Sequence, residues 1–578
     1  MEENPRMGGN SRTIRTCWTA LFSVILLCST GSAASIDSSR ASDLGAVSSE
    51  SKVCSEIGVE LLKRGGNAAD AMVATTLCVG VIGMQHSGIG GGGFMLVRGS
   101  DGKYESIDFR ETAPAAAFED MYKDNIMGSV RGGLSSGVPG DVRGLEYLHS
   151  NYGKLPWRAV CNPAIHVARY GFPVTHDLVR YMDVATSNGN KFLTDDPQWA
   201  VDFAPNGTRV GLGDILTRKR YANTLEAIAK HGSKAFYEGK IANYTIAALQ
   251  AQNGTMTLED LKDYNVTIRK PISITYRGHR VYSCGAPSGG SVALSILKII
   301  EGYNMSDASI SNLNIHRLDE AMRFSYAARS SLGDPDFFSY MHALESSMLL
   351  PSTASSIRAR ISDNTTHNIS YYASPSHPLY SLPSNHGTSH IVTSDKSGLS
   401  VSSTSTVNLL FGSQLVVPET GVVMNNEMND FSIPGIRNAF GFVPSPINYI
   451  RPFKRPLSSI SPLIIEHANG TLLLSIGAAG GSRIPTATVQ GAWHVLDHGM
   501  GLGAALGERR LHDQLVPATT AFEEGFGGEV VESMRGRGHN VSWVGHAESA
   551  VQGVLRGCDG VFEAASEPRQ RDSGGVSC

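Results

Sequence analysis

The chain has no concentrated block of basic residues. Its 49 lysines and arginines are scattered among 53 aspartates and glutamates, and the formal net charge is −4. Proteins that bind nucleic acid gather positive charge on one face or in one segment, so a nucleic acid is not an expected partner. The sequence also has no internal repeat and no long low-complexity linker. A hydrophobic fraction of 41% with 18% charged residues is typical of a globular protein.

Cysteine is scarce, and the close ligand spacings of zinc sites are missing. The chain contains no C-x-x-C pair and no histidine-rich run, the patterns that usually mark such sites. We therefore expect no metal ion and no other cofactor. An even number of cysteines follows residue 34, which permits disulfides in an oxidising compartment but leaves their pairing open. These cysteines are Cys54, Cys78, Cys161, Cys284, Cys558 and Cys578.

Long apolar runs are absent after the N-terminal segment. Residues 1–34 combine three arginines, an apolar run at 17–28 and small residues at 29–34, the order found in a secretory signal peptide. Left uncleaved, the same segment would be a type II signal-anchor with its basic end in the cytoplasm. Both alternatives place the rest of the chain outside the cytosol. We expect either secretion or attachment to the extracellular face of the plasma membrane.

The chain carries nine N-x-Ser/Thr acceptor patterns for N-linked glycans. Any one of them could be unused, because the pattern marks only an acceptor. Nine together are more typical of a secreted glycoprotein than of a cytosolic protein. They begin at Asn206, Asn243, Asn253, Asn265, Asn304, Asn364, Asn368, Asn469 and Asn540.

A glycine-rich run at 88–93 formally matches G-x-G-x-x-G. A dinucleotide-binding loop follows a strand and opens a helix whose N-terminus faces the pyrophosphate. Here a helical pattern at 68–81 precedes the run, and a strand-like segment at 94–97 follows it. Because this order is reversed, we expect no nucleotide cofactor. We interpret the glycines as positions of close backbone packing, which only glycine permits.

Helical patterns dominate the first part of the chain and strand patterns crowd the last part, which predicts an α/β layered fold. Apolar periodicity predicts a helical pair within 54–80, interrupted at Gly65 and Gly66. A stretch at 352–384, rich in serine, asparagine, histidine and proline, is predicted to be exposed and flexible. Further helices are expected at 142–151, 221–231, 292–302 and 315–331, and strands at 389–392, 399–410, 421–424 and 471–476.

An ordered series of polar and glycine-rich segments follows residue 385. It reads HGTSH at 386–390, STSTVN at 403–408, NNEMNDFS at 425–432, PLSS at 456–459 and GAAGGS at 477–482. Earlier segments are GGNAADA at 65–71, HSGIGGG at 86–92, DFRETAP at 108–114 and VPG at 138–140. Any one segment alone could be a turn or a strand end. Together they resemble the γ-glutamyltransferase family (γ-glutamyl transpeptidase, glutathione hydrolase) of the N-terminal-nucleophile hydrolase superfamily.

The resemblance implies a four-layer αββα sandwich, in which helices enclose two central sheets. It also implies that the precursor cleaves its own Gly387–Thr388 bond. The products would be a large chain, residues 35–387, and a small chain, residues 388–578, that stay together as a heterodimer. Cleavage would free the α-amino group of Thr388. Such a group has a pKa of about 8, so part of it can accept a proton near neutral pH.

The same resemblance assigns the catalytic residues. Thr388 would be the nucleophile through its hydroxyl and the base through its amine. Thr406 would orient that amine and assist cleavage. Gly480 and Gly481 would donate backbone N–H groups to the oxyanion formed during attack.

A γ-glutamyl group carries an α-carboxylate and an α-ammonium, and the resemblance implies partners for both. A planar guanidinium, assisted by two hydroxyls, suits the two oxygens of the carboxylate. Two carboxylates and a side-chain amide suit the ammonium. The residues implied are Arg110, Ser458 and Ser459 for the carboxylate, and Asn408, Glu427 and Asp430 for the ammonium.

The expected donors are glutathione and other γ-glutamyl compounds, and the expected acceptors are water, amino acids and dipeptides. Two alternatives stay open: a related acylase with a different donor, and an uncleaved, non-enzymatic glycoprotein of the same fold. Animal relatives have a disulfide where this chain has Cys54 and Cys78, and we expect that bond here. Asn385 and Asn429 stand where relatives commonly carry an acidic residue, so maturation rate or acceptor choice could differ.

Overall fold

The computed structural model of the chain describes residues 43–373, 387–436 and 444–578. The N-terminal signal or anchor, residues 1–34, lies outside these residues, as do Asn385 and His386. In the described part of the chain, no helix combines the length and the apolar character needed to cross a membrane.

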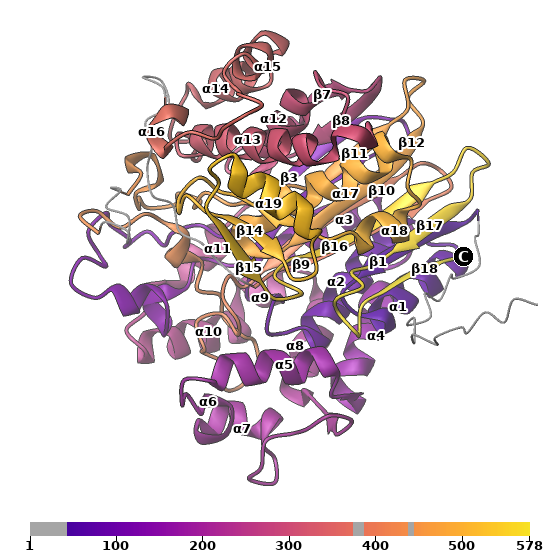
Figure 1. Cartoon of the computed structure of the whole chain (residues 1–578). Helices are drawn as coiled ribbons and strands as arrows, with labels where there is room; N and C mark the ends of the chain where they lie inside the picture. Colours follow the sequence, from indigo (N-terminus) through magenta and orange to yellow (C-terminus); the bar gives the residue numbers. More distant parts are fainter. Residues whose placement is uncertain (1–42, 374–386, 437–443) are drawn as a thin grey trace, which may run out of the picture. The chain divides into compact units, whose positions relative to one another are not determined.

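Two antiparallel sheets form the centre of the described fold (Figure 1). One has seven strands, in the order β18 (Gly574–Ser577), β1 (Gly45–Ser49), β9 (Ser389–Asp395), β10 (Ser400–Thr406), β2 (Gly92–Arg98), β3 (Tyr104–Asp108) and β6 (Thr267–Arg269). The other has six, in the order β17 (Phe562–Ala565), β16 (Ala550–Arg556), β12 (Leu472–Ala479), β11 (Leu463–Glu466), β8 (His279–Ser283) and β7 (Ile272–Tyr276).

The hydroxyl-rich strands β9 and β10 are buried along their whole length. Burying a hydroxyl is costly unless it is hydrogen-bonded, and the hydroxyls of these two strands have partners except for Ser403 Oγ. Ser400 Oγ lies 2.5 Å from Ser475 Oγ on β12, and Ser402 Oγ donates to Ile476 O at 3.3 Å. His390 Nδ1 lies 2.8 Å from Thr404 Oγ1. The two sheets therefore stack through polar contacts of small side chains.

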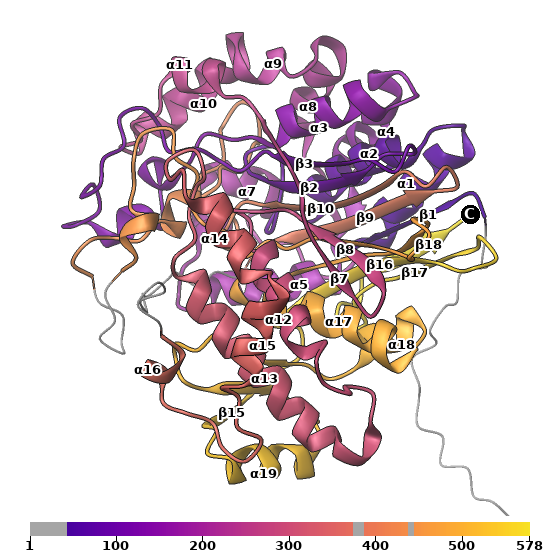
Figure 2. The ribbon, with the colours of Figure 1, turned by 90° about the horizontal axis from the view of Figure 1, so that it is seen from above.

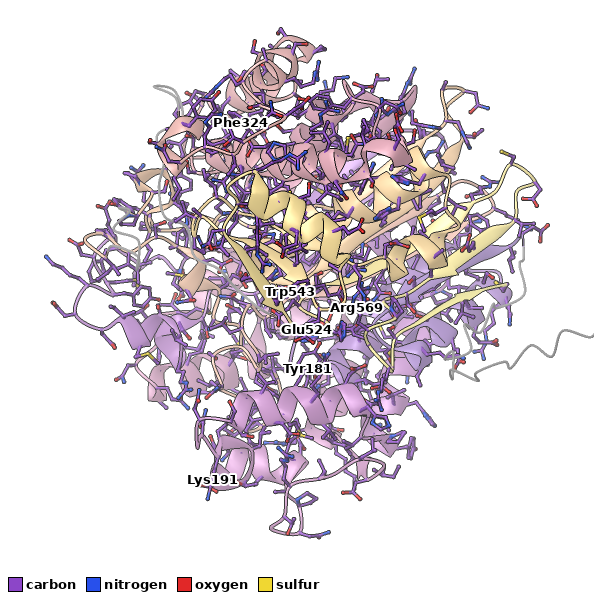
Figure 3. All side chains as sticks on the ribbon, in the orientation of Figure 1. Tyr181, Lys191, Phe324, Glu524, Trp543 and Arg569 are labelled. Carbon is purple, nitrogen blue, oxygen red and sulfur yellow. A yellow bond between two sulfur atoms is a disulfide. The ribbon has the colours of Figure 1, made fainter. Side chains whose placement is uncertain are left out.

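Helices cover the outer face of each sheet (Figure 2). Against the seven-stranded sheet pack α1 (Lys52–Lys63), α2 (Ala68–Ile82) and α3 (Asp141–Tyr152), with α4 (Trp157–Tyr170) and α8 (Lys219–His231) behind them. The six-stranded sheet is covered by α12 (Gly290–Ile300), α17 (Ile484–His498) and α18 (Leu502–Gly507), and α13 (Ser311–Arg329) packs on α12. Buried apolar side chains pack between the helices and the sheets, and Figure 3 shows the side chains on the ribbon. The predicted αββα arrangement is confirmed.

Shorter elements surround these layers. The helices are α5 (His176–Thr186), α6 (Phe192–Asp195), α7 (Pro197–Phe203), α9 (Lys234–Tyr237), α10 (Gly239–Ala251), α11 (Leu258–Asp263), α14 (Met341–Met348), α15 (Pro351–Arg358), α16 (Ile369–Tyr372) and α19 (Gly528–Gly536). The strands are β4 (Phe172–Pro173), β5 (Ile215–Leu216), β13 (Leu511–His512), β14 (Thr520–Glu523) and β15 (Val541–Val544).

The helical pair predicted within 54–80 is present as α1 and α2. Asn67 begins α2 with a capping box: its side chain accepts from Asp70 N, and the Asp70 carboxylate accepts from Asn67 N, which satisfies two exposed donors of the first turn. The Cys54–Cys78 disulfide joins the two helices, as the resemblance implied. Cys161, Cys284, Cys558 and Cys578 are unpaired within the described ranges.

The glycine run follows α2 and leads into β2, which begins at Gly92; this is the order that argued against a dinucleotide site. Its glycines allow close backbone approach, as predicted. A Cβ atom added to Gly91 would lie 1.9 Å from Thr406 O, and one added to Gly93 would lie 1.9 Å from Thr404 O. Both distances are far below van der Waals contact, so any side chain at Gly91 or Gly93 would displace β10, including its last residue, Thr406.

Two local predictions differ from the structure. Residues 352–373 are mostly exposed or half-buried, as predicted, but part of the stretch is helical: it contains most of α15 and all of α16, because Pro351 opens the first helix at a position where proline is tolerated; residues 374–384 lie outside the described part. Residues 421–424 form only an isolated bridge, Val416 to Val423, instead of a strand. Gly421 has a φ of 68°, a conformation that interrupts an extended chain. All nine predicted glycan acceptors have exposed asparagines.

Candidate active site

Thr388 immediately precedes β9 and is 7% exposed. Its Oγ1 donates to Gly387 O at 2.6 Å, and Thr406 Oγ1 donates to the same oxygen at 2.7 Å. The two hydroxyl oxygens are 3.5 Å apart. Because β9 and β10 are antiparallel neighbours, the residue before one strand lies beside the last residue of the other. Two hydroxyls thus converge on the carbonyl of the Gly387–Thr388 peptide bond.

Asn408 holds the Thr406 hydroxyl in place. Its backbone N–H donates to Thr406 Oγ1 at 2.8 Å, which leaves the Thr406 proton free for the carbonyl. Asn408 has a φ of 76°, a left-handed conformation that asparagine tolerates better than most residues. Its Nδ2 donates to Asn426 O at 2.9 Å. Its Oδ1 is buried and accepts no hydrogen bond within the described residues, so it remains available for a donor in the cavity.

Arg110 lies two residues after β3 and forms ion pairs with Glu427 and Asp430. All three side chains are almost completely buried. Tyr264 OH donates to Arg110 O at 2.9 Å and fixes the backbone there. Burial raises the pKa of Glu427 well above its usual value, and the guanidinium only partly opposes this shift. Burial also raises the pKa of the neighbouring Glu111 to about 8.

Ser458 and Ser459 lie opposite this charged group. Ser458 N donates to Pro287 O at 2.8 Å, and Ser458 Oγ accepts from Ile460 N at 3.1 Å. Ser459 Oγ accepts from Arg329 Nη2 at 3.0 Å. Arg329 is the last residue of α13, and burial lowers the pKa of its guanidinium. A second arginine therefore reaches this serine pair.

The glycine pair lies between β12 and α17. Gly480 and Gly481 have φ values of 126° and 58°, and a side chain at either position would be strained. A Cβ atom on Gly480 would also lie 2.7 Å from Glu548 O. Next to them, Tyr326 OH donates to Ser482 O. The turn is thereby anchored to α13, the helix that carries Arg329.

One cavity brings most of the predicted residues together. It is lined by Arg110, Thr388, Thr406, Asn408, Glu427, Asp430, Ser458, Ser459 and Gly481. Gly480 lines a neighbouring cavity that Thr388 and Gly387 also reach. Five segments separated by up to hundreds of residues thus meet at one threonine.

The sequence interpretation missed several residues that line this cavity: Arg329, Asn448, Leu457, Ile460, Ser482 and Ile484. Leu457, Ile460 and Ser482 lie within or beside the quoted motifs, so their neighbours pointed to them. Arg329 lies at the end of a long helix with no motif around it. Only the fold brings that helix end to Ser459.

The chain was compared with known proteins. Residues 54–577 match the family described as Gamma-glutamyltranspeptidase. A "Glutathione hydrolase proenzyme" of Arthroderma benhamiae is 52% identical, with 92% of both chains covered. A "Glutathione hydrolase" of Aspergillus flavus is 46% identical over 92% of this chain and 89% of the relative.

Solved structures agree with this likeness. Cephalosporin acylase from Bacillus halodurans superposes with a TM-score of 0.83 at 27% identity, covering 96% of this chain and 99% of the other. A chain of Helicobacter pylori gamma-glutamyltranspeptidase gives a TM-score of 0.53 at 32% identity over 58% of this chain and 96% of its own. Matches of this extent and identity show that the chain belongs to the γ-glutamyltranspeptidase family.

Proposed function

We propose that this protein is a γ-glutamyltransferase and glutathione hydrolase that matures by cutting its own Gly387–Thr388 bond. The observation that carries the proposal is the convergence of the Thr388 and Thr406 hydroxyls on Gly387 O, at 2.6 and 2.7 Å. They do so at the edge of a cavity that holds Arg110, Glu427 and Asp430.

Cleavage begins with attack of Thr388 Oγ1 on the carbonyl carbon of Gly387. The Thr406 hydroxyl donates to the carbonyl oxygen, which stabilises the charge that develops there. The C–N bond breaks, an ester to Thr388 Oγ1 forms, and the hydroxyl proton ends on the released amine. Water then hydrolyses the ester and leaves a carboxylate on Gly387 and a free amine and hydroxyl on Thr388.

The mature cavity suits a γ-glutamyl group because the cavity and the substrate each carry positive and negative charges. In the unliganded site, Arg110 pairs with Glu427 and Asp430. The substrate carboxylate takes Arg110 as its partner, with Ser458 and Ser459 as further donors. The substrate ammonium takes the two carboxylates and the free Asn408 Oδ1. Every buried charge then keeps a partner, which avoids the cost of an isolated buried charge.

Transfer repeats the same chemistry on the substrate. Thr388 Oγ1 attacks the γ-carbonyl carbon of glutathione, and the Thr388 amine accepts the hydroxyl proton and passes it to the departing amine. Backbone N–H groups of Gly480 and Gly481 stabilise the oxyanion, a contribution of about 3–4 kcal/mol for each such donor. The ester is then consumed by water, giving hydrolysis, or by the amine of an amino acid or dipeptide, giving transfer.

A related acylase is the second candidate, because the structure resembles cephalosporin acylase with a TM-score of 0.83. The two differ in donor, so a γ-glutamyl anilide and simple acyl amides lacking the α-carboxylate and α-ammonium separate them. We expect turnover of the γ-glutamyl compound only. Faster turnover of the acyl amides would assign the protein to the acylases.

N-terminal sequencing of the smaller chain after reducing electrophoresis tests the maturation step. We expect a chain that begins at Thr388. A single intact chain without γ-glutamyl activity would instead support a non-enzymatic glycoprotein. We also propose that the protein works outside the cytosol, secreted or held by residues 1–34, since all nine glycan acceptors are exposed. A shift in mobility after glycosidase treatment of the natural protein checks this location.

A further inference from the structure

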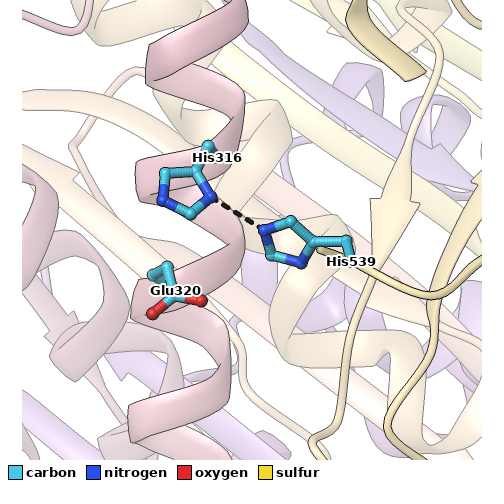
Figure 4. Close-up of side chains that lie close together, drawn as sticks. All are labelled: His316, Glu320 and His539. Carbon is cyan, nitrogen blue, oxygen red and sulfur yellow. Dashed lines mark hydrogen bonds between the residues drawn. The ribbon is translucent and has the colours of Figure 1, made fainter. Parts of the chain in front are cut away.

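A second buried polar cluster lies on α13, away from the cavity beside Thr388. His316 and Glu320 are one helical turn apart and project from the same face, and His539 approaches from the connection between α19 and β15 (Figure 4). One ligand atom from each residue lies within 4.8 Å of the others. His316 and His539 are separated by 223 positions in the chain, which is why the sequence showed no metal-ligand spacing.

The outer nitrogen of each imidazole faces an acceptor. His316 Nε2 lies 2.7 Å from Ser362 O, and His539 Nδ1 lies 3.1 Å from Asp319 Oδ2. The carbonyl favours a proton on His316 Nε2, and the carboxylate favours one on His539 Nδ1, which also lies 3.5 Å from Thr520 Oγ1. Histidines that bind metals are oriented in this way, by a carbonyl or carboxylate that accepts from the nitrogen not bound to the ion.

The inner nitrogens face each other. His316 Nδ1 is 2.8 Å from His539 Nε2. With both outer nitrogens protonated, two neutral rings would bring two lone pairs together. A cation is needed between them: either one extra proton or a metal ion. Tetrahedral coordination at about 2.0–2.1 Å would set these nitrogens about 3.3 Å apart, so the rings need to separate by only about half an ångström.

Glu320 decides between a proton and a metal ion. Its Oε1 accepts from Thr366 Oγ1 at 2.6 Å and Tyr372 OH at 2.7 Å. Its Oε2 is buried and accepts no hydrogen bond within the described ranges, and one of the two carboxylate oxygens lies within 4.8 Å of a nitrogen of each imidazole. A proton shared by two histidines leaves Oε2 without a partner, whereas a metal ion gives it one.

The surrounding charge also favours a divalent cation. The buried acidic groups are Asp319, Glu320 and Asp513, and the buried cation among them is Arg323, 2.9 Å from Asp513 Oδ2. When the three carboxylates and the guanidinium are all ionised and the histidines are neutral, these groups carry a net charge of −2. Buried charges are retained where they are compensated, and one divalent ion compensates both.

We propose that His316, Glu320 and His539 bind one divalent transition-metal ion. Two imidazoles and a carboxylate suit Zn²⁺ best among common ions, with water as the fourth ligand. The ion ties α13 to the 537–540 connection. If the chain is cut at Thr388, as proposed above, it also joins the large chain to the small chain. Only this bridging role depends on the cleavage.

The test uses the full chain, stripped with a chelator, loaded with Zn²⁺ and desalted, with bound zinc measured by mass spectrometry and melting temperature by calorimetry. The variant is Glu320→Gln, which keeps an Oε1 acceptor for Thr366 and Tyr372. The matched control is His498→Gln, which removes an exposed histidine one turn from His494 on α17 and so removes one surface histidine pair that could bind zinc adventitiously.

We expect one zinc per chain in the natural protein and in His498→Gln, with a higher melting temperature than the stripped protein. Glu320→Gln should bind at least tenfold more weakly and show no rise in melting temperature. Zinc retention by Glu320→Gln equal to that of the natural protein would overturn the proposal, as would a natural protein that retains none. Thr388→Ala should bind zinc normally, which separates failure of this site from failure of the proposed cleavage.

Discussion

The two ends of α13 serve two different polar clusters. At its C-terminal end, Tyr326 and Arg329 contact Ser482 and Ser459 at the cavity beside Thr388. Thirteen residues earlier, about 20 Å along the helix, His316 faces His539 at 2.8 Å. The first cluster lines a cavity. In the second, three buried side chains bring one possible ligand atom each within 4.8 Å of the others.

The balance of charge differs in the same way. In the cavity, Arg110 already pairs with Glu427 and Asp430, so the zwitterion of the proposed reaction exchanges partners without leaving a buried charge alone. In the closed cluster, acidic groups outnumber the arginine, and the proposed metal ion supplies the missing positive charge. The two proposals therefore assign buried charge to a ligand that enters and leaves at one end of α13, and to permanent cohesion at the other.

The largest expected effect is that of Thr388→Ala. Without the hydroxyl, neither self-cleavage nor γ-glutamyl transfer has a nucleophile, and we expect activity to fall at least about a thousandfold. Reducing electrophoresis should show one intact chain. The matched control is Thr393→Ala on the same strand, whose hydroxyl donates to Ala68 O at 2.7 Å; it should mature and remain active. Two chains from Thr388→Ala would move the cleavage site elsewhere.

A matched pair of arginine substitutions tests the contrast directly. Arg110→Lys keeps the charge but loses the planar fork that reaches two carboxylates, and we expect kcat/KM for a γ-glutamyl anilide to fall about a hundredfold, equivalent to about 3 kcal/mol. Arg323→Lys, in the closed cluster, should lower the melting temperature and leave kcat/KM within about threefold. Equal loss of activity from both would mean that the clusters are functionally coupled through α13.

The residues that the resemblance assigned to the site meet in one cavity, because they lie in a few short segments. Thr388 immediately precedes β9, Thr406 ends the adjacent β10 with Asn408 two residues later, and Glu427 and Asp430 share one turn. Each segment carries several functional residues, so a local pattern is visible. The layered fold was equally predictable, since helices and strands follow local periodicity and β9 and β10 begin within one residue of their predicted starts.

Features created only by tertiary contact could not be predicted. Arg329 lies in no motif of the sequence. It meets Ser459 only because the end of α13 lies beside the segment that carries Ser458 and Ser459. Residues 351–358 are serine-rich yet helical, because packing of α15 against α12 outweighs their weak local preference. His539 lies in a different chain segment from His316, so no spacing rule connects them.

A smaller effect is expected from Thr406→Val, which removes one hydroxyl at nearly constant volume. Gly387 O loses a donor and Asn408 N loses its acceptor, so self-cleavage should slow about tenfold, the effect of one hydrogen bond of about 1.4 kcal/mol. Pulse-chase labelling measures the lifetime of the precursor. Thr404→Val on the same strand, which loses a contact to His390 instead, is the control. An unchanged precursor lifetime in Thr406→Val would remove Thr406 from the cleavage step.

The last expected effect concerns stability and pH rather than activity. Burial raises the pKa of Glu111 to about 8, so between about pH 4.5 and 8 the folded chain binds a proton that the unfolded chain does not. This contribution to stability is complete below pH 4.5 and is lost as the pH rises toward 8, at no more than about 1.4 kcal/mol per pH unit.

Glu111→Gln should flatten the fall of melting temperature over this range, and the exposed control Glu60→Gln should not. Asp141, whose pKa burial raises to about 7, keeps part of the slope. A slope unchanged by Glu111→Gln would mean that Glu111 stays ionised beside Arg110, so that the cavity holds more negative charge than its pairing with the arginine suggests.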